Sequence, residues 1–324
     1  MTRPPLPQPS RPLTIAVLGA SGFIGRALVS SAPAGLVAVR GLSAPRVYTA
    51  ASTPAELAAE SGVHFAAGDL ASQLAGVDVV INAAGLASPD EAEGDEALVG
   101  ANGLLPALIA HAATRAGVRR VVHLSSAAVQ GNVAQLDETE RVAPFSAYSR
   151  SKALGEQALA IVAAGLPGVE VVSIRATSVQ GAERKTTKQL VRLASSPLSS
   201  VAGSGLGPSV ASSVDELAYF VYYVALVSTV PPQIVLQPWE GATAVSVLRS
   251  AGGKEPASLP SALCRLAVRA GYAVSGLLGE RLHGLVRRVE LMWFGQGQAQ
   301  GWADEQGFTP DRAVLRLLEN VREG

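Results

Sequence analysis

Two short motifs in this chain hold residue types that can do chemistry together. The stretch Gly19-Ala20-Ser21-Gly22-Phe23-Ile24-Gly25 follows an apolar run, and Tyr148-Ser149-Arg150-Ser151-Lys152 lies well downstream, with Ser125-Ser126 between them. A glycine-rich turn that opens a helix can hold a dinucleotide pyrophosphate. A tyrosine with a lysine one helical turn later can move a proton beside a nicotinamide ring. Together they predict nicotinamide-dependent oxidoreduction or a redox-assisted sugar reaction.

The spaced glycines of the first motif have separate physical roles. Gly19 permits a tight turn, Gly22 lets the backbone approach the pyrophosphate, and Gly25 lets the helix pack closely on the sheet. Because the chain has 33 glycines, the alternative is an ordinary glycine turn, and the preceding strand and following helix favour cofactor binding. The cofactor-binding residues predicted here are Gly19, Ser21, Gly22, Phe23, Ile24 and Gly25.

Three further segments are expected to meet the cofactor. Arg40 is predicted at the end of the second strand, where an arginine suits the 2′-phosphate of NADP and an acidic residue would suit NAD. We therefore expect NADP(H), with NAD(H) as the alternative, and Arg46 as an assisting group. Asp69, after the third predicted strand, can accept a hydrogen bond from the adenine amino group. For Arg40 and Asp69 the alternative is a solvated side chain. Asn82-Ala83-Ala84-Gly85 offers small residues where a cofactor passes the backbone.

Apolar runs alternate with helical patterns through most of the chain. The predicted strands are 14–18, 36–40, 63–67, 77–82, 119–124, 169–175 and 234–236, and the predicted helices are 23–30, 95–116, 146–164, 185–195 and 214–227. Such alternation predicts an α/β fold with a Rossmann-type, doubly wound parallel sheet. We assign 13–181 to this dinucleotide-binding domain, with 214–236 returning to it. Residues 182–213 and 237–324 are predicted to form a smaller, mostly helical substrate-binding region.

The composition restricts the class of protein. Hydrophobic residues make up 48% and charged residues 16%, with a formal net charge of +0, so no nucleic-acid partner is indicated. The single cysteine, Cys264, allows no internal disulfide, and the four histidines lack metal-ligand spacing, so we predict no metal site and a cytoplasmic location. Residues 1–12 are expected to be a flexible proline-rich arm. The uncharged run between Glu216 and Glu240 is split by Pro231-Pro232, which favours a buried helix and strand over a membrane span.

The combined motifs resemble the extended short-chain dehydrogenases/reductases of the nucleotide-sugar epimerase/dehydratase group. The resemblance covers roughly 13–220 and includes the glycine motif. Its other matching residues are Asp69-Leu70, Asn82-Ala83-Ala84, Asn102, the run from Gly117 to Ser126, Val129-Gln130-Gly131, Tyr148 to Lys152, Ile174-Arg175 and Val214 to Ala218. It implies that Leu70, Asn82, Ala83, Ala84 and Asn102 also belong to the cofactor site, and that the protein is a homodimer.

The same resemblance implies the catalytic roles. Tyr148 would be the acid/base, and Lys152 would bind the nicotinamide ribose and lower the tyrosine pKa. Ser126 would hold the substrate carbonyl or hydroxyl. Proton transfer at oxygen then accompanies hydride transfer to or from the nicotinamide. A surface lysine beside a half-buried tyrosine is the alternative, but the chain has only four lysines and six tyrosines.

Several positions depart from the family pattern. Ala127-Ala128 stand where dehydratases carry an acidic pair, which disfavours water elimination. Gln130 replaces the usual tyrosine, and Ala176 replaces a proline before Thr177, so Gln130 and Thr177 are candidate substrate contacts. The arginine that binds the sugar-nucleotide phosphate falls at Ser209. The expected replacements are Lys185, Lys188 and Arg192, which share one helix face unless that face is simply solvated.

The C-terminal region alternates apolar residues at helical spacing with arginines. The apolar residues are Leu263, Leu266, Ala267, Ala270, Val274, Leu277, Leu278, Leu282, Leu285 and Val286, and the arginines are Arg265, Arg269, Arg281, Arg287 and Arg288. The pattern fits a helix packed on its own domain or a basic amphipathic surface that contacts a membrane peripherally. Trp293, Phe294, Trp302 and Phe308 would line a substrate pocket or close the core.

The sequence favours an NADP(H)-dependent reductase that acts on a keto group of a nucleotide- or lipid-linked sugar. An NAD-dependent epimerase that retains its cofactor is the first alternative. A non-catalytic protein that senses NADP(H) is the second. The intact set of Ser126, Tyr148 and Lys152 argues against the second, because a sensor has no need for all three.

Overall fold

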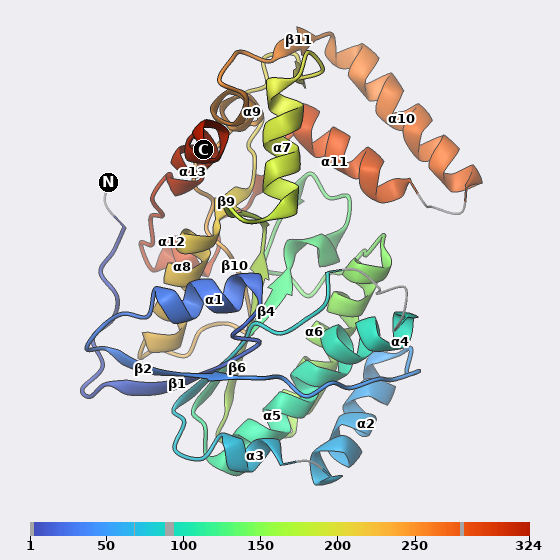
Figure 1. Cartoon of the computed structure of the whole chain (residues 1–324). Coiled ribbons are helices and arrows are strands. Elements are labelled where there is room, and N and C mark those ends of the chain that lie inside the picture. Colours follow the sequence, from blue (N-terminus) through green and yellow to red (C-terminus); the bar gives the residue numbers. More distant parts are fainter. Residues whose placement is uncertain (1–2, 68, 88–93, 279–281) are drawn as a thin grey trace.

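The computed structural model, which describes residues 3–67, 69–87, 94–278 and 282–324, is built on a six-stranded parallel sheet. The strands lie in the order β10-β6-β4-β3-β1-β2 (Figure 1). Their bounds are β1 Leu13–Leu18, β2 Val37–Leu42, β3 Val79–Asn82, β4 Arg120–Ser126, β6 Glu170–Ala176 and β10 Ile234–Leu236. The chain leaves β1 to one side for β2 and returns to the other side for β3. In doubly wound sheets ligands bind at such a reversal, so we expect a ligand crevice at the carboxyl ends of β1 and β3.

Helices cover both faces of the sheet (Figure 1). Helices α1 (Phe23–Ser30) and α8 (Val214–Leu226) lie on one face, and α2 (Pro54–Ala67), α5 (Leu105–Ala116) and α6 (Ala147–Ala164) lie on the other. Alternate residues of β1 feed the two cores, since Ile15 and Val17 belong to one cluster and Ala16 and Leu18 to the other. The predicted doubly wound α/β fold is confirmed.

The helix predicted over 95–116 is continuous but contains a π-helical turn. It comprises α4 (Gly94–Val99), the turn η1 (Gly100–Leu104) and α5, and it ends at Gly117 with φ of 72°. Gly100 lies so close to β2's outgoing loop that a Cβ there would be 1.9 Å from the Val47 carbonyl oxygen. In the described part of the chain, Gly94–Ala116 alone has the length and apolar character of a membrane span. Its apolar segment is 78% buried, as expected of a core helix.

The strand predicted over 63–67 is wrong, because these residues form the end of helix α2. The helix begins with a reciprocal cap, in which Glu56 N donates to Thr53 Oγ1 and Thr53 N donates to a Glu56 carboxylate oxygen. Near its end, the Phe65 ring stacks on His111 of α5 with 5.7 Å between ring centroids. The cap and this stacking keep the segment helical beside α5, although Val63 and Phe65 have strand propensity.

The remaining elements form the region predicted to bind substrate, over the carboxyl ends of the strands (Figure 1). Its helices are α7 Lys185–Ser195, α9 Ala244–Gly252, α10 Ser261–Leu277, α11 His283–Phe294, α12 Trp302–Glu305 and α13 Ala313–Glu323. Short parallel strand pairs join it: β7 (Ser178–Gln180) with β9 (Ala211–Ser213), β8 (Ser200–Ala202) with β11 (Ala257–Leu259), and β5 (Gln135–Leu136) with β12 (Gly297–Gln298). Arg281, predicted in the basic C-terminal pattern, lies outside the described residues.

The packing decides between the two alternatives for Trp302 and Phe308 and differs from the prediction for the N-terminal arm. Trp302 and Phe308 join the core against α8, where the Phe308 ring meets the Tyr223 ring at 5.0 Å, so they close the core and do not line a pocket. The described residues 3–12 are docked rather than free. Arg3 pairs with Glu216 at 2.7 Å, and the Tyr219 hydroxyl donates to the Pro4 carbonyl oxygen at 2.6 Å.

Candidate active site

The glycine turn and the segment after β3 meet at the crevice. Gly19 has φ of 78°, and a Cβ at this position would lie 2.7 Å from Ala84 N. Asn82 is fully buried and holds that segment, since its Oδ1 accepts from Ala84 N and its Nδ2 contacts His123 Nδ1 at 3.1 Å. The predicted residues Gly19, Asn82 and Ala84 are therefore brought together. Asn82 does this by holding the backbone of the segment after β3.

The start of helix α1 fits a dinucleotide pyrophosphate. Its N-cap, Gly22, has no side-chain cap, so the first-turn N–H groups remain available to an anion. Ser21 and Gly22 are exposed, while Gly25 is buried, and a Cβ on Gly25 would lie 2.0 Å from the Gly19 carbonyl oxygen. The turn is accessible and leaves no room for a side chain on its inner side, as a phosphate-binding turn requires.

The predicted nucleotide contacts from β2 and residue 69 are not placed as expected. Strand β2 continues to Leu42, and Arg40 pairs in register with Ala16, so Arg40 lies two residues before the strand end. Its guanidinium donates to the carbonyl oxygens of Gln73 and Ala75. The strand-end position on which the NADP argument for Arg40 depended is wrong for this residue.

Contrary to the prediction, Asp69 and Leu70 do not follow a strand. They stand at the start of the short helix α3 (Leu70–Gln73), where Asp69 is exposed and Leu70 is buried in the core beside α5. Because 63–67 is helical, no strand directs Asp69 toward the crevice.

The predicted catalytic residues come from β4 and α6. Ser126 is the last residue of β4, and its Oγ accepts from Ala128 N at 3.2 Å. Helix α6 begins at the N-cap Ser146, whose Oγ accepts from Ser149 N in a capping box. This start places Tyr148 in the first turn and Lys152 one turn later. Burial raises the pKa of Tyr148, whereas its hydrogen bond with Ser126 and the charge of Arg184 lower it.

Lys152 is buried beneath the crevice. Its Nζ donates to the Leu124 carbonyl oxygen at 3.0 Å, and burial lowers the pKa of Lys152 to about 8. Gly85 lies beside it, since a Cβ there would be 3.0 Å from Lys152 Nζ and 2.6 Å from Asn102 Oδ1. Asn102 clamps the same segment through the Leu86 N–H and carbonyl and also donates to Ser151 Oγ. The predicted residues Asn102 and Lys152 thus lie together beside Gly85.

A buried network that was not predicted lies behind helix α6. Arg175 forms an ion pair of 2.5 Å with Glu156, which also accepts from Ser125 Oγ at 2.8 Å. Both charged side chains are nearly inaccessible, at 0% and 5% exposure. Glu156 lies one turn after Lys152, so a Tyr-x-x-x-Lys-x-x-x-Glu spacing on α6 was the available signal. The network ties α6 to β4 and β6.

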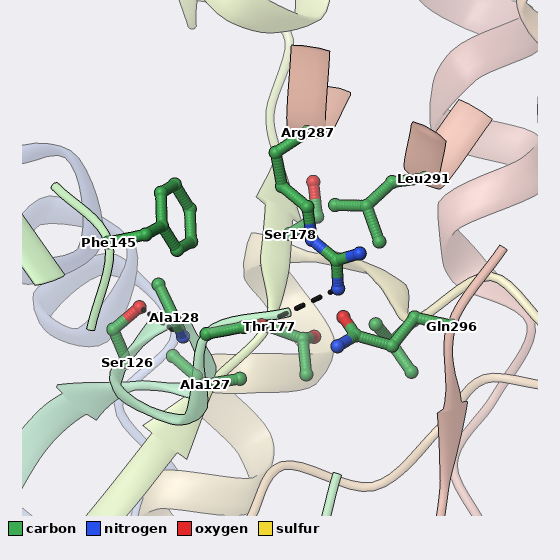
Figure 2. A pocket seen from close by; sticks show the side chains of 12 residues that line it. Ser126, Ala127, Ala128, Phe145, Thr177, Ser178, Arg287, Leu291 and Gln296 are labelled. Carbon is green, nitrogen blue, oxygen red and sulfur yellow. Dashed lines mark hydrogen bonds between the residues drawn. The ribbon is translucent and has the colours of Figure 1, made fainter. Parts of the chain in front are cut away.

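A cavity of ≈ 180 Å³ opens beside Ser126. Figure 2 shows Ser126, Ala127 and Ala128 on one side and Arg287 entering from α11 on the other, with Leu291 and Gln296 nearby. Phe145, Thr177, Ser178 and Val210 also line it. The Arg287 guanidinium reaches Glu290 and the carbonyl oxygens of Gly131 and Val133. The walls are mainly apolar, with one guanidinium and one amide, and sequence analysis did not foresee Arg287 here.

Arg184 is a second basic group that the sequence did not single out. It precedes α7 and donates to the Val179 carbonyl oxygen. Its guanidinium carbon lies 5.2 Å from the ring centroid of Phe23, a residue of the predicted cofactor motif. The charge of Arg184 also lowers the pKa of Tyr148, so this arginine acts on both the predicted cofactor motif and the predicted acid/base tyrosine.

Of the predicted substrate contacts, one lines the cavity and the others do not. Thr177 lines the cavity. Gln130 is buried and bonded to Asp137, so it holds its own loop. The basic residues predicted to replace the phosphate clamp, Lys185, Lys188 and Arg192, are exposed on α7, with Lys188 paired to Glu183. None of these three lines the cavity beside Ser126 in the described part of the chain.

Comparison with known proteins identifies the family. The sequence model of the NAD dependent epimerase/dehydratase family matches residues 15–207. A Stigmatella aurantiaca enzyme named 4-hydroxy-2-methyl-3-oxo-4-farnesyl-3,4-dihydroquinoline-1-oxide ketoreductase is 32% identical over 174 residues, or 52% of this chain and 50% of that protein. The chain thus spans about half the length of this curated relative.

Solved structures share the fold. UDP-glucuronic acid 4-epimerase from Bacillus cereus, in complex with NAD, has a TM-score of 0.63 and 17% identity, covering 95% of this chain and 96% of that chain. The human epimerase family protein SDR39U1 with NADPH has a TM-score of 0.62 and 20% identity, covering 96% and 100%. At these identities the likeness concerns the fold alone.

This chain therefore belongs to the NAD dependent epimerase/dehydratase family, as its motifs predicted. Its family is one of NAD-dependent enzymes. No cluster of metal-ligating side chains occurs among the residues that the structure describes.

Proposed function

We propose that this protein is an NADP(H)-dependent reductase of a keto group. The observation that carries the proposal is the cavity that brings Ser126, at the end of β4, to a mainly apolar wall built with α11. When bound, the reduced nicotinamide supplies the hydride. Ser126 holds the substrate oxygen, Tyr148 gives it a proton, and Lys152 with Asn102 orients the cofactor ribose.

The cavity favours a largely apolar ketone, such as a lipid-linked sugar, over a nucleotide diphosphate. Ser209 replaces the family's phosphate-binding arginine, and its backbone bonds to the Ala242 carbonyl oxygen and to Trp239 Nε1. The guanidinium of Arg287 is already occupied by Glu290 and two carbonyls, so it offers an anion little unshared charge. The matching Stigmatella ketoreductase is named for a farnesylated dihydroquinoline, which is also mainly apolar.

The preference for NADP(H) rests on the loop after β2. Residues 37–46 contain no carboxylate to bind a ribose 2′-hydroxyl. Arg46, exposed four residues beyond Leu42, takes over the 2′-phosphate contact that we first expected of Arg40. An Arg46→Ala variant should lose affinity for NADPH but not NADH, whereas Arg40→Ala should change neither.

An epimerase with retained cofactor is the second candidate, because the family model that matches includes NAD-dependent epimerases. A dehydratase is disfavoured, since Ala127 and Ala128 line the cavity without an acid or base. Dimerisation through α6, a cytoplasmic location, and substrate binding by 182–213 and 237–324 stay predictions. A non-catalytic sensor would bind NADP(H) tightly without turnover.

The test follows cofactor and turnover in the purified protein. Spectroscopy first shows whether NAD(H) is retained, and fluorescence titration then compares NADPH with NADH. NADPH oxidation is next measured with a prenylated cyclic ketone and with a UDP-4-keto sugar. Faster turnover of the prenylated ketone supports the proposal. Retained NAD with interconversion of UDP-sugars overturns it in favour of epimerisation, and tight NADPH binding without turnover favours the sensor.

A further inference from the structure

Helix α10 exposes an apolar stripe on its outer side. Leu263, Leu266, Val274 and Leu277 are 57%, 64%, 49% and 87% exposed. A separate stripe, containing Cys264, Val268 and Ser275, is buried. The helix therefore packs on the protein through one apolar stripe and exposes a second apolar stripe to solvent. An ordinary surface helix carries charged and polar residues on its exposed side.

The exposed stripe continues beyond α10. Leu278 and Leu282, which stand before and after 279–281 in the sequence, are 52% and 37% exposed, and Leu285 of α11 is 61% exposed. We call Leu263, Leu266, Val274, Leu277, Leu278, Leu282 and Leu285 the leucine face. The α10–α11 hairpin projects from the body of the molecule (Figure 1). Single exposed leucines are ordinary, but a contiguous apolar face of this kind marks an interaction surface.

The charged side chains of helix α10 are arginines. Helix α10 carries Arg265 and Arg269 and no carboxylate, and neither arginine has a carboxylate partner among the described residues. Arginines that flank a leucine-rich helix face are the composition of helices that lie in a membrane interface. This charge matches anionic headgroups.

A second copy of the chain fits this face less well. A two-fold interface would place the same patch against itself and bring Arg265 and Arg269 of two copies together, and helix α10 carries no carboxylate to pair them. An anionic bilayer accepts the leucines below its headgroups and the arginines at them.

The inner side of the same hairpin forms part of the cavity. Arg287 and Leu291 of α11 line the space beside Ser126, and Phe294 lines an adjoining cavity of ≈ 570 Å³. Helix α11 thus carries Leu285 of the leucine face as well as the cavity-lining Arg287 and Leu291.

We propose that the α10–α11 hairpin docks this protein onto an anionic phospholipid surface. The leucine face enters the boundary between headgroups and acyl chains, and Arg265 and Arg269 contact the headgroups. The docking does not depend on the proposed reaction. Its consequence, that a lipid-borne ketone reaches the cavity from the bilayer past α11, rests on the proposed function.

The test is co-sedimentation of the full chain with vesicles of phosphatidylcholine alone and of phosphatidylcholine mixed with phosphatidylglycerol. We expect binding to the mixed vesicles. An R265S/R269S variant should bind roughly 30-fold more weakly, at about 1 kcal/mol for each arginine. An L263Q/L266Q/L277Q variant should lose more than about 100-fold. Because these side chains are exposed, circular dichroism should show wild-type folding.

Matched controls lie away from the hairpin. The Val63→Gln change removes a side chain that is 71% exposed on α2, and R115S/R316S removes two exposed arginines from α5 and α13. Both controls should bind like the wild type. The proposal is overturned if the wild-type chain ignores the mixed vesicles or if the controls weaken binding as much as the hairpin variants. It is also overturned if analytical ultracentrifugation shows a dimer that only the leucine variant dissociates, without vesicle binding. Vesicle binding needs no turnover, so it is decided independently of the reductase assay.

Discussion

Lys152 donates a hydrogen bond of 3.0 Å from its Nζ to the carbonyl oxygen of Leu124, two residues before Ser126 on β4. This bond joins the middle of α6 to the strand that carries the candidate substrate contact. It holds the Lys152 ammonium against the main chain of β4, and Tyr148 lies one helical turn before Lys152 on α6. A main-chain contact thus fixes the position of Lys152 relative to Ser126, two of the residues predicted to be catalytic.

Replacing Tyr148 with Phe should lower kcat/KM for ketone reduction by about 10²- to 10⁴-fold, since the proton donor is lost while the ring remains. Cofactor affinity, measured by fluorescence titration, should change little. Tyr48→Phe is the matched control, because Tyr48 is 45% exposed and lies outside the cavity. Equal activity of the wild type and the Tyr148 variant would remove Tyr148 from the proposed mechanism.

Replacing Arg184 with Gln should shift the pH profile of ketone reduction. The charge of Arg184 lowers the pKa of Tyr148, so its removal raises that pKa further. Reduction needs the protonated phenol, and the fall in kcat/KM at alkaline pH should therefore occur at higher pH in the variant. The profile is measured with saturating NADPH.

Two further variants separate the charge of Arg184 from its packing on Phe23. Arg184→Lys should keep the wild-type profile, and Arg192→Gln, which removes an exposed arginine of α7, should leave it unchanged. A profile of Arg184→Gln that moves to lower pH, or does not move, contradicts an electrostatic role.

The sheet and its glycine turn could be predicted because their signals are local. Buried parallel strands are continuous apolar runs, as in Val79–Asn82, and Gly117 and Gly165 end the predicted helices. The strand predicted over 63–67 was wrong because the apolar composition of these residues suits a strand. The Thr53–Glu56 cap that starts the helix lies ten residues earlier, outside the local pattern. The strand end predicted at Arg40 was wrong because Gly41 and Leu42 continue the pairing with β1.

The cavity could be predicted only in part, because its walls are assembled from distant segments. Ser126 and Thr177 follow strands and were found by motif. Arg287 reaches them only because α11 folds back over the sheet, and no sequence spacing relates it to Ser126. Trp302 and Phe308 are similar in composition to pocket-lining residues, and only the packing of α12 against α8 shows that they fill the core.

Replacing Gly25 with Ala should disrupt the cofactor turn. The new Cβ would lie 2.0 Å from the Gly19 carbonyl oxygen and 2.8 Å from Ala20 Cα, both backbone atoms that cannot yield without moving the turn. We expect a loss of more than about 2 kcal/mol in the free energy of unfolding and loss of NADPH binding. Urea denaturation and fluorescence titration measure these effects.

The control for Gly25 is Gly284→Ala on α11. A Cβ at Gly284 meets no atom within 4 Å, and alanine favours a helix over glycine by about 0.5–1 kcal/mol. This variant should be at least as stable as the wild type and bind NADPH normally. Wild-type cofactor affinity in the Gly25 variant would show that the turn does not hold the dinucleotide.

Glu240 should make stability depend on pH in the neutral range. Its side chain is 1% exposed and accepts hydrogen bonds from Ser212 Oγ, Ser213 N and Val314 N, which connect α8 to α13. Burial raises the pKa of Glu240 from 4.5 to about 7, against the effect of these donors. Between these two values the folded protein keeps a proton that the unfolded chain has lost. The free energy of unfolding should therefore fall as pH rises from 4.5 to about 7, by roughly 3 kcal/mol, and then level off.

Urea denaturation across this pH range, compared between the wild type and Glu240→Gln, isolates that contribution. The amide does not titrate, so the variant should lack this part of the slope. It should also show a pH-independent loss, because one acceptor for Val314 N is replaced by a donor. Glu255→Gln, which removes an exposed carboxylate paired with Arg249, should keep the wild-type slope. A Glu240→Gln variant with the full wild-type slope would mean that Glu240 is ionised in the folded protein throughout the range, held so by its three hydrogen-bond donors.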